Sequence, residues 1–114
     1  MRSIHFNGMT FVVPSAKKGF ILNLRAYSIS HDTVRNVYYW VESLIEAEKK
    51  VRLFTRFTVQ TFGAVTVYAE VRRDDNFALE ATYDTTRYSE ERWKLALHDT
   101  HGNFIKWLGY PTAA

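Results

Sequence analysis

Hydrophobic residues alternate with polar ones in three successive segments: 51–61, 65–73 and 77–84. Side chains of a β-strand point alternately to its two faces, so this alternation is typical of strands with one buried face. Three-residue loops at 62–64 and 74–76 would place Phe57 opposite Ala69 and Val71 opposite Leu79, and a one-residue slip would break this agreement. The pattern predicts an antiparallel meander of three strands.

The N-terminal segment carries the strongest short-range hairpin signal. Asn7-Gly8 supplies the two positive-φ residues of a type I′ turn, which would pair Phe6 with Met9 and Ile4 with Phe11. A further strand is expected over 20–29, with apolar residues on both faces, as in a strand that is covered on two sides.

A helix is predicted over 32–49. Capping side chains occur in Ser30 to Thr33, and apolar residues then recur at helical spacing. Beyond the meander, 93–98 and 104–108 are expected to pair across a turn at 99–103, although the helix formers in 89–98 leave a helix there as the alternative.

These elements together predict an α+β fold. One amphipathic helix would pack on one face of a curved antiparallel β-sheet built from the N-terminal hairpin, the central meander and the C-terminal hairpin. With 114 residues, the chain is expected to form one domain over 1–114.

Composition narrows the function classes. The absence of cysteine excludes disulfides, thiol catalysis and thiolate metal sites. A net charge of +3 permits contact with nucleic acid without requiring it. No apolar run is long enough for a membrane span and the N-terminus lacks a signal region, so we expect a soluble cytoplasmic protein.

The polar face of the meander is a candidate nucleic-acid-binding surface. Basic and aromatic residues would alternate there, and aromatic rings stack on bases while arginines meet phosphates. The alternative is a set of ordinary cross-strand pairs, since Glu70 and Glu80 would stand in the same row. The candidate residues are Phe54, Arg56, Tyr68 and Arg72.

Tyr39 and Trp40 form the candidate protein-binding site. On the predicted helix Tyr39 would point away from the core and Trp40 would lie at the edge, as in an interface hot spot. Alternatively, the N-terminal hairpin covers that side. No catalytic motif, cofactor motif or metal site is evident, so the favoured function is a small non-enzymatic protein-binding domain, comparable to inhibitors and accessory proteins of phages or mobile elements.

The tripeptide His-Asp-Thr occurs twice, at residues 31–33 and 98–100. Paired His-x-Thr elements resemble the signature of the 2H phosphoesterases, which implies a phosphodiesterase with His31 and His98 as general acid and base. The middle residue is Asp in both copies, where that family has an apolar residue. Asp32 also fits a helix cap and Asp99 a turn. Because His31 would start the helix and His98 would end a strand, we expect that the two imidazoles do not share a pocket.

Overall fold

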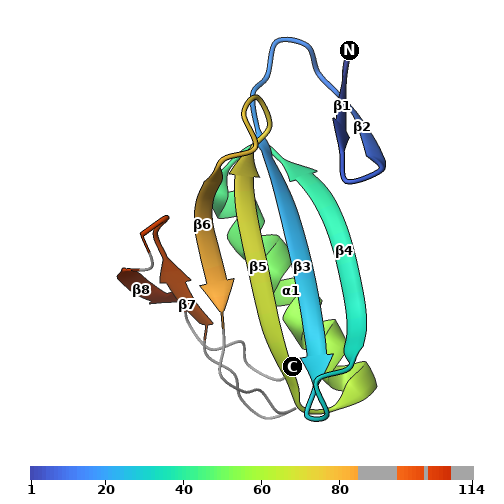
Figure 1. Cartoon of the computed structure of the whole chain (residues 1–114), viewed down its shortest axis with the longest axis vertical. Helices are drawn as coiled ribbons and strands as arrows, with labels where there is room; N and C mark the ends of the chain where they lie inside the picture. The colour runs from blue at the N-terminus through green and yellow to red at the C-terminus, as the bar shows by residue number, and fades with distance from the viewer. Residues whose placement is uncertain (85–94, 102, 109–114) are drawn as a thin grey trace.

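The computed structural model describes residues 1–84, 95–101 and 103–108. Along the chain, four strands are followed by one helix and four further strands (Figure 1). These elements are β1 (Arg2–Phe6), β2 (Met9–Val13), β3 (Phe20–Ser28), β4 (Thr33–Val41), α1 (Leu44–Phe62), β5 (Val65–Arg73), β6 (Leu79–Asp84), β7 (Leu95–His98) and β8 (Phe104–Leu108).

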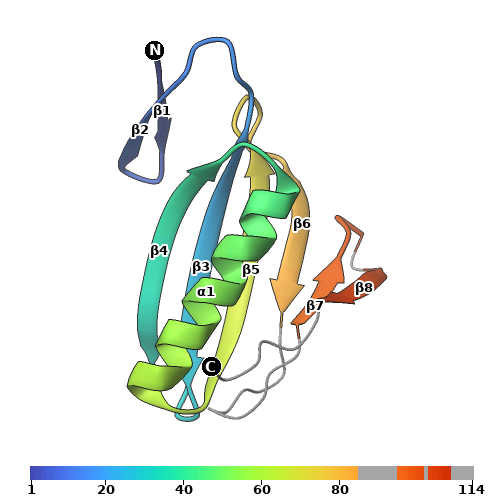
Figure 2. The same cartoon turned by 180° about the vertical axis from the view of Figure 1, so that it is seen from behind.

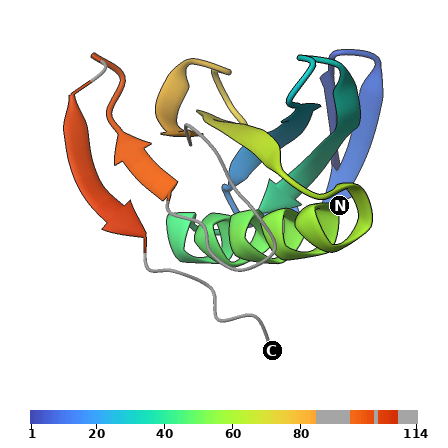
Figure 3. The ribbon, with the colours of Figure 1, turned by 90° about the horizontal axis from the view of Figure 1, so that it is seen from below.

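One sheet and one helix form the body of the fold. The sheet has the strand order β4-β3-β5-β6-β7-β8, and all neighbouring strands are antiparallel. Helix α1 crosses one face of this sheet (Figure 2), while the separate β1-β2 hairpin lies on the other side (Figure 3). The predicted α+β class, with one helix on an antiparallel sheet, is confirmed, but the N-terminal hairpin, which was expected to be part of that sheet, forms a two-stranded sheet of its own.

The helix predicted over 32–49 is misplaced: residues 33–41 form strand β4, the helix begins only after Ser43, and only 44–49 are helical as predicted. Segment 33–41 is rich in β-branched and aromatic residues, which favour a strand that is packed on both faces. The true helix start carries the Ser-x-x-Glu sequence of a capping box: Ser43 Oγ accepts from the Glu46 N–H at 3.1 Å, while the Glu46 carboxylate accepts from the N–H of Glu42, the residue before the cap, at 2.8 Å.

The predicted first strand of the meander, 51–61, is also wrong, because this segment lies inside α1. The buried residues of α1 follow helical spacing rather than alternation: Ala47, Val51, Phe54, Thr55, Thr58 and Val59. Phe57, which alternation placed in the core, is exposed. The expected pair of Phe57 and Ala69 does not exist, since Ala69 pairs with Leu24 of β3.

The other predicted strands are present. The N-terminal hairpin pairs Phe6 with Met9 and Ile4 with Phe11, and both turn residues have positive φ, 48° at Asn7 and 77° at Gly8. Strands β5 and β6 pair as expected. A bulge after Val71, however, sets Val71 opposite Ala81 instead of Leu79.

The C-terminal hairpin is likewise a pair of strands, β7 and β8. The alternative of a helix is therefore excluded for residues 95–98. Trp93 and the rest of 85–94 lie outside the described residues.

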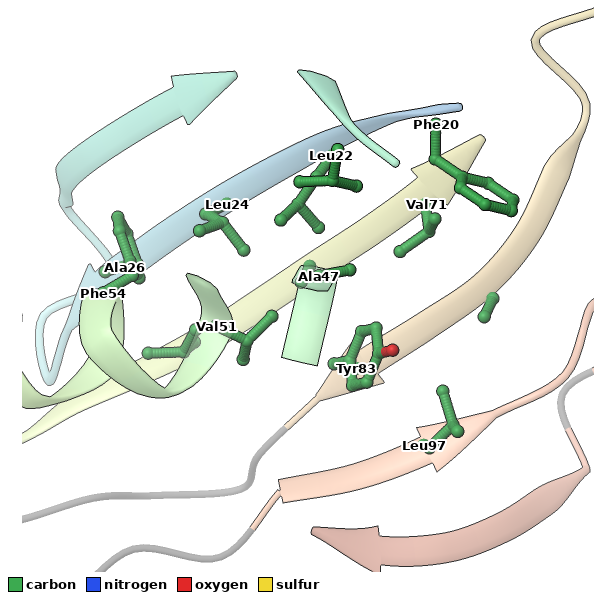
Figure 4. Close-up of a cluster of buried hydrophobic side chains, with 14 of the residues drawn as sticks. Phe20, Leu22, Leu24, Ala26, Ala47, Val51, Phe54, Val71, Tyr83 and Leu97 are labelled. Carbon is green, nitrogen blue, oxygen red and sulfur yellow. The ribbon is translucent and has the colours of Figure 1, made fainter. Parts of the chain in front are cut away.

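The main core lies between α1 and the sheet (Figure 4), where β3 contributes Phe20, Leu22, Leu24 and Ala26. We call this side of the sheet the helix face and the opposite side the open face. A second, smaller cluster joins Ile4 and Val13 of the hairpin to Ile21 of β3. The hairpin therefore covers one end of the open face.

Candidate functional site

Tyr39 and Trp40 do not form the exposed pair expected from a helix, because neighbouring residues of a strand point to opposite faces. Tyr39 packs against the main core, with Lys50 Nζ 4.8 Å from its ring centroid. Trp40 packs in the hairpin cluster and donates from Nε1 to Asp74 at 2.7 Å. For Trp40 the alternative is correct: the N-terminal hairpin covers it.

The candidate nucleic-acid row is divided between two elements. Phe54 and Arg56 lie on α1, where Phe54 is buried beneath the guanidinium of Arg35 at 4.8 Å. Only Tyr68 and Arg72 share the open face, on β5. The predicted four-residue row is therefore wrong, because the segment that carries Phe54 and Arg56 is helical.

Two arginines and a glutamate meet in the middle of the open face. Arg25 of β3 and Arg72 of β5 approach the same carboxylate, that of Glu70, at 2.9 and 3.5 Å. Farther along the face, Tyr27 and Tyr68 pack edge to face with their centroids 5.7 Å apart. Arg25 and Tyr27 were missed in the sequence because β3 was read as a doubly covered strand.

The topology separates His31 from His98. His31 lies in the turn after β3, and His98 ends β7, with β5 and β6 between these strands. Three strand spacings alone separate β3 from β7 by roughly 14 Å. His98 pairs with Thr82, Thr82 with Glu70, and Glu70 with Asn23 in β3. His98 is therefore level with the middle of β3, whereas His31 lies beyond the end of that strand.

A buried carboxylate joins the hairpin to the sheet. Asp74 Oδ2 accepts from Arg2 at 2.7 Å, from the Gly19 N–H at 3.0 Å and from Trp40 Nε1 at 2.7 Å. Burial raises the pKa of Asp74, but the hydrogen bonds from Trp40, Arg2 and Gly19 lower it by more, so its pKa lies below the usual value. This network is structural and explains why the hairpin is fixed over Trp40.

The outer face of α1 exposes several large apolar side chains. Ile45, Leu53 and Phe57 lie along it and are 70, 49 and 55% exposed. The four-residue spacing from Leu53 to Phe57 places these two side chains on adjacent turns of the helix. Single exposed apolar residues are common on proteins, but an aligned row of large ones is typical of an interaction site.

Three cations stand among these apolar side chains: Lys49 and Arg52, which are exposed, and Arg56, which is partly buried. None of them makes an ion pair within the part of the chain that the structure describes. The nearby Glu46 is used in the helix cap. We call the six residues Ile45, Lys49, Arg52, Leu53, Arg56 and Phe57 the α1 outer face. Sequence reasoning missed it because alternation assigned Leu53 and Phe57 to a buried strand face.

Comparison of the chain with protein-family models, with curated protein sequences and with solved structures gives no match. In the described residues, no helix has the length and apolar character needed to cross a membrane. Nor does any group of three or more His, Asp or Glu side chains there form a metal site.

Proposed function

We propose that the protein is a non-enzymatic binding domain that docks on an acidic protein surface through the α1 outer face. The observation that carries the proposal is the row of exposed apolar side chains with three cations among them that form no ion pair within residues 1–84, 95–101 and 103–108. Burying such side chains in an interface gains free energy at about 25 cal/mol per Å² of apolar surface. A partner with carboxylates would also satisfy Lys49, Arg52 and Arg56.

The composition of this face favours a protein over nucleic acid. Ile45 and Leu53 have no flat ring on which a base could stack. Protein–DNA interfaces are also more polar than a surface centred on three large apolar residues. An aromatic anchor beside arginines, by contrast, is typical of protein hot spots.

The same face does not suit insertion into lipid. Helices that lie in the membrane interface separate an apolar side from a charged side. Here Lys49 stands between Ile45 and Leu53, so charge and apolar surface are mixed along one row. Such mixing matches a protein surface with apolar sites and carboxylates in fixed positions.

The positive charge of the whole chain supports the choice of an acidic partner. The net charge is +3, and long-range attraction between opposite charges speeds association. A domain of this kind would act by occupying its partner's surface, as inhibitors and accessory proteins do.

Site-specific photo-crosslinking tests the proposal. A photoreactive residue at position 57 should attach to one acidic protein in a lysate of the native host. The yield of this adduct should fall as salt is raised before irradiation, because salt screens the charges that hold the complex together. The matched control carries the same group at Val12, a 62% exposed apolar residue on the hairpin. Equal crosslinking of the same protein from both positions would contradict docking through α1.

A further inference from the structure

A groove of about 380 Å³ lies on the open face, at the place where the hairpin turn meets the sheet. Residues from four strands and the hairpin turn line it. Phe6 and Asn7 form one end, Tyr38 stands beside them, and the floor carries Asn23, Arg25, Glu70 and Arg72. The volume is in the range of small-molecule sites. This surface is on the opposite side of the sheet from the α1 outer face.

The floor of the groove has an excess of positive charge. Two guanidiniums, of Arg25 and Arg72, share the single carboxylate of Glu70. Arg72 also donates to the carbonyl of Phe77 at 2.8 Å, and the side chains of Arg25 and Arg72 both remain 32% exposed. A planar guanidinium with a donor to spare is suited to a phosphate group.

The other end of the groove offers aromatic surface and unused polar atoms. Phe6 is held in place by a stacked contact with Phe77, at 4.7 Å between centroids, and by the edge of Tyr38. Asn7 donates to the Tyr38 hydroxyl at 3.2 Å, which leaves the hydroxyl proton of Tyr38 available to donate. The Asn23 amide donates to Asn36 and Val37, so its oxygen remains an acceptor.

We infer that this groove binds a nucleoside monophosphate, with its phosphate on Arg25 and Arg72 and its base towards Phe6, Asn7 and Tyr38. A nucleotide combines the three properties that the lining calls for: an anion, a flat ring and several hydrogen-bonding groups. The ligand is a free nucleotide rather than one unit of a strand. The hairpin packs on Ile21 at one end of the open face, so a nucleic-acid strand that ran along β3 would meet the hairpin beyond Tyr38.

Calorimetric titration of the full chain with AMP, UMP, adenosine, inorganic phosphate and a mixed 12-nucleotide single strand tests this inference. AMP or UMP should bind with a Kd below about 1 mM. Adenosine and phosphate should each bind at least about tenfold more weakly than the mononucleotides, because each lacks half of the ligand. No binding of either mononucleotide, equal binding of adenosine, or tighter binding of the 12-mer would overturn the inference.

Variants assign the binding to the groove. Arg25→Met should weaken mononucleotide binding about tenfold or more, since charge-assisted hydrogen bonds are lost. Arg52→Met, which removes a guanidinium from the opposite side of the sheet, should leave it unchanged. Tyr38→Phe removes only a hydroxyl and should weaken binding severalfold, which provides a second test if Arg25→Met unfolds the chain. Unchanged affinity in Tyr38→Phe and in folded Arg25→Met would contradict the site. Arg52 belongs to the α1 outer face and Arg25 to the groove. Loss of protein docking and loss of nucleotide binding are therefore tested by different variants and can fail independently.

Discussion

The indole of Trp40 donates a 2.7 Å hydrogen bond to the buried carboxylate of Asp74, and this bond ties strand β4 to the loop between β5 and β6. Asp74 holds the N-terminal hairpin at the same time, through Arg2. One carboxylate oxygen thus joins three segments that are distant in sequence. The arrangement makes Asp74 a centre of stability outside the hydrophobic core.

Asp74→Asn should destabilise the fold by about 2 kcal/mol, because hydrogen bonds to a charged acceptor are replaced by weaker ones. The free energy of unfolding, measured by urea denaturation, checks this value. Asp75→Asn is the matched control, since Asp75 is exposed and its ion pair is with the exposed Lys18 at 3.4 Å. Equal effects of the two substitutions would show that the network around Asp74 contributes little.

Asp74 should also make stability depend on pH. Its pKa is lower in the folded state than in the unfolded state, so its contribution is fully present above about pH 4 and is lost as pH falls through the folded pKa. The melting temperature of the parent should therefore fall more steeply below pH 4 than that of Asp74→Asn. Parallel curves for the two proteins would contradict the lowered pKa.

Gly19→Ala should destabilise the fold by about 1–3 kcal/mol, as overpacking does. A Cβ at Gly19 would overlap the Trp40 ring and the carbonyl of Val41. Thermal melting measures the effect, with Lys18→Ala, an exposed neighbour, as control. If Gly19→Ala melts like the parent, the close approach of this loop to β4 is not as described.

The helix cap offers a comparison between two serines. Ser43→Ala should cost about 1 kcal/mol, since Ser43 Oγ accepts the N–H of Glu46 at the helix start. Ser30→Ala should have almost no effect, because Ser30 is exposed in the turn between β3 and β4. Urea denaturation of both variants decides whether the helix begins at 44 or near 32, and a larger loss in Ser30→Ala would favour the earlier start.

Helix register can be tested in the same way. Phe54→Ala should cost about 3–5 kcal/mol, because Phe54 is only 4% exposed between α1 and the sheet. Phe57→Ala should change stability by about 0.5 kcal/mol or less, as surface substitutions do. The reverse order would restore the alternating pattern in which Phe57 is buried.

Local signals predicted the N-terminal hairpin with its register, and the pairing of the C-terminal strands, whereas competing periodicities misplaced the helix. Asn7-Gly8 determines its turn and register without help from distant residues. In 51–61, by contrast, apolar residues satisfy both a period of 2 and a period of 3.6, since Leu53 and Phe57 lie on the outer face of a helix whose inner face carries Val51 and Phe54. The capping box at Ser43 could have decided between them.

The predicted candidate sites depended on whether 51–61 is a strand or a helix. Once 51–61 is helical, Leu53 and Phe57 become exposed and Phe54 becomes buried, which exchanges the expected surface for the expected core. The groove between Arg25 and Tyr38 could not be predicted, because it exists only where the hairpin folds back on the open face. No local pattern indicates that contact.

The affinity of the double variant Leu53→Ser/Phe57→Ser for the crosslinked partner tests the central claim most directly. Calorimetry with the purified partner should show a loss of about 2 kcal/mol or more, roughly thirtyfold in Kd, because the apolar centre of the interface is removed. Val12→Ser, which removes an equally exposed apolar side chain from the hairpin, should bind like the parent. Docking through α1 is contradicted if the folded double variant binds as tightly as Val12→Ser.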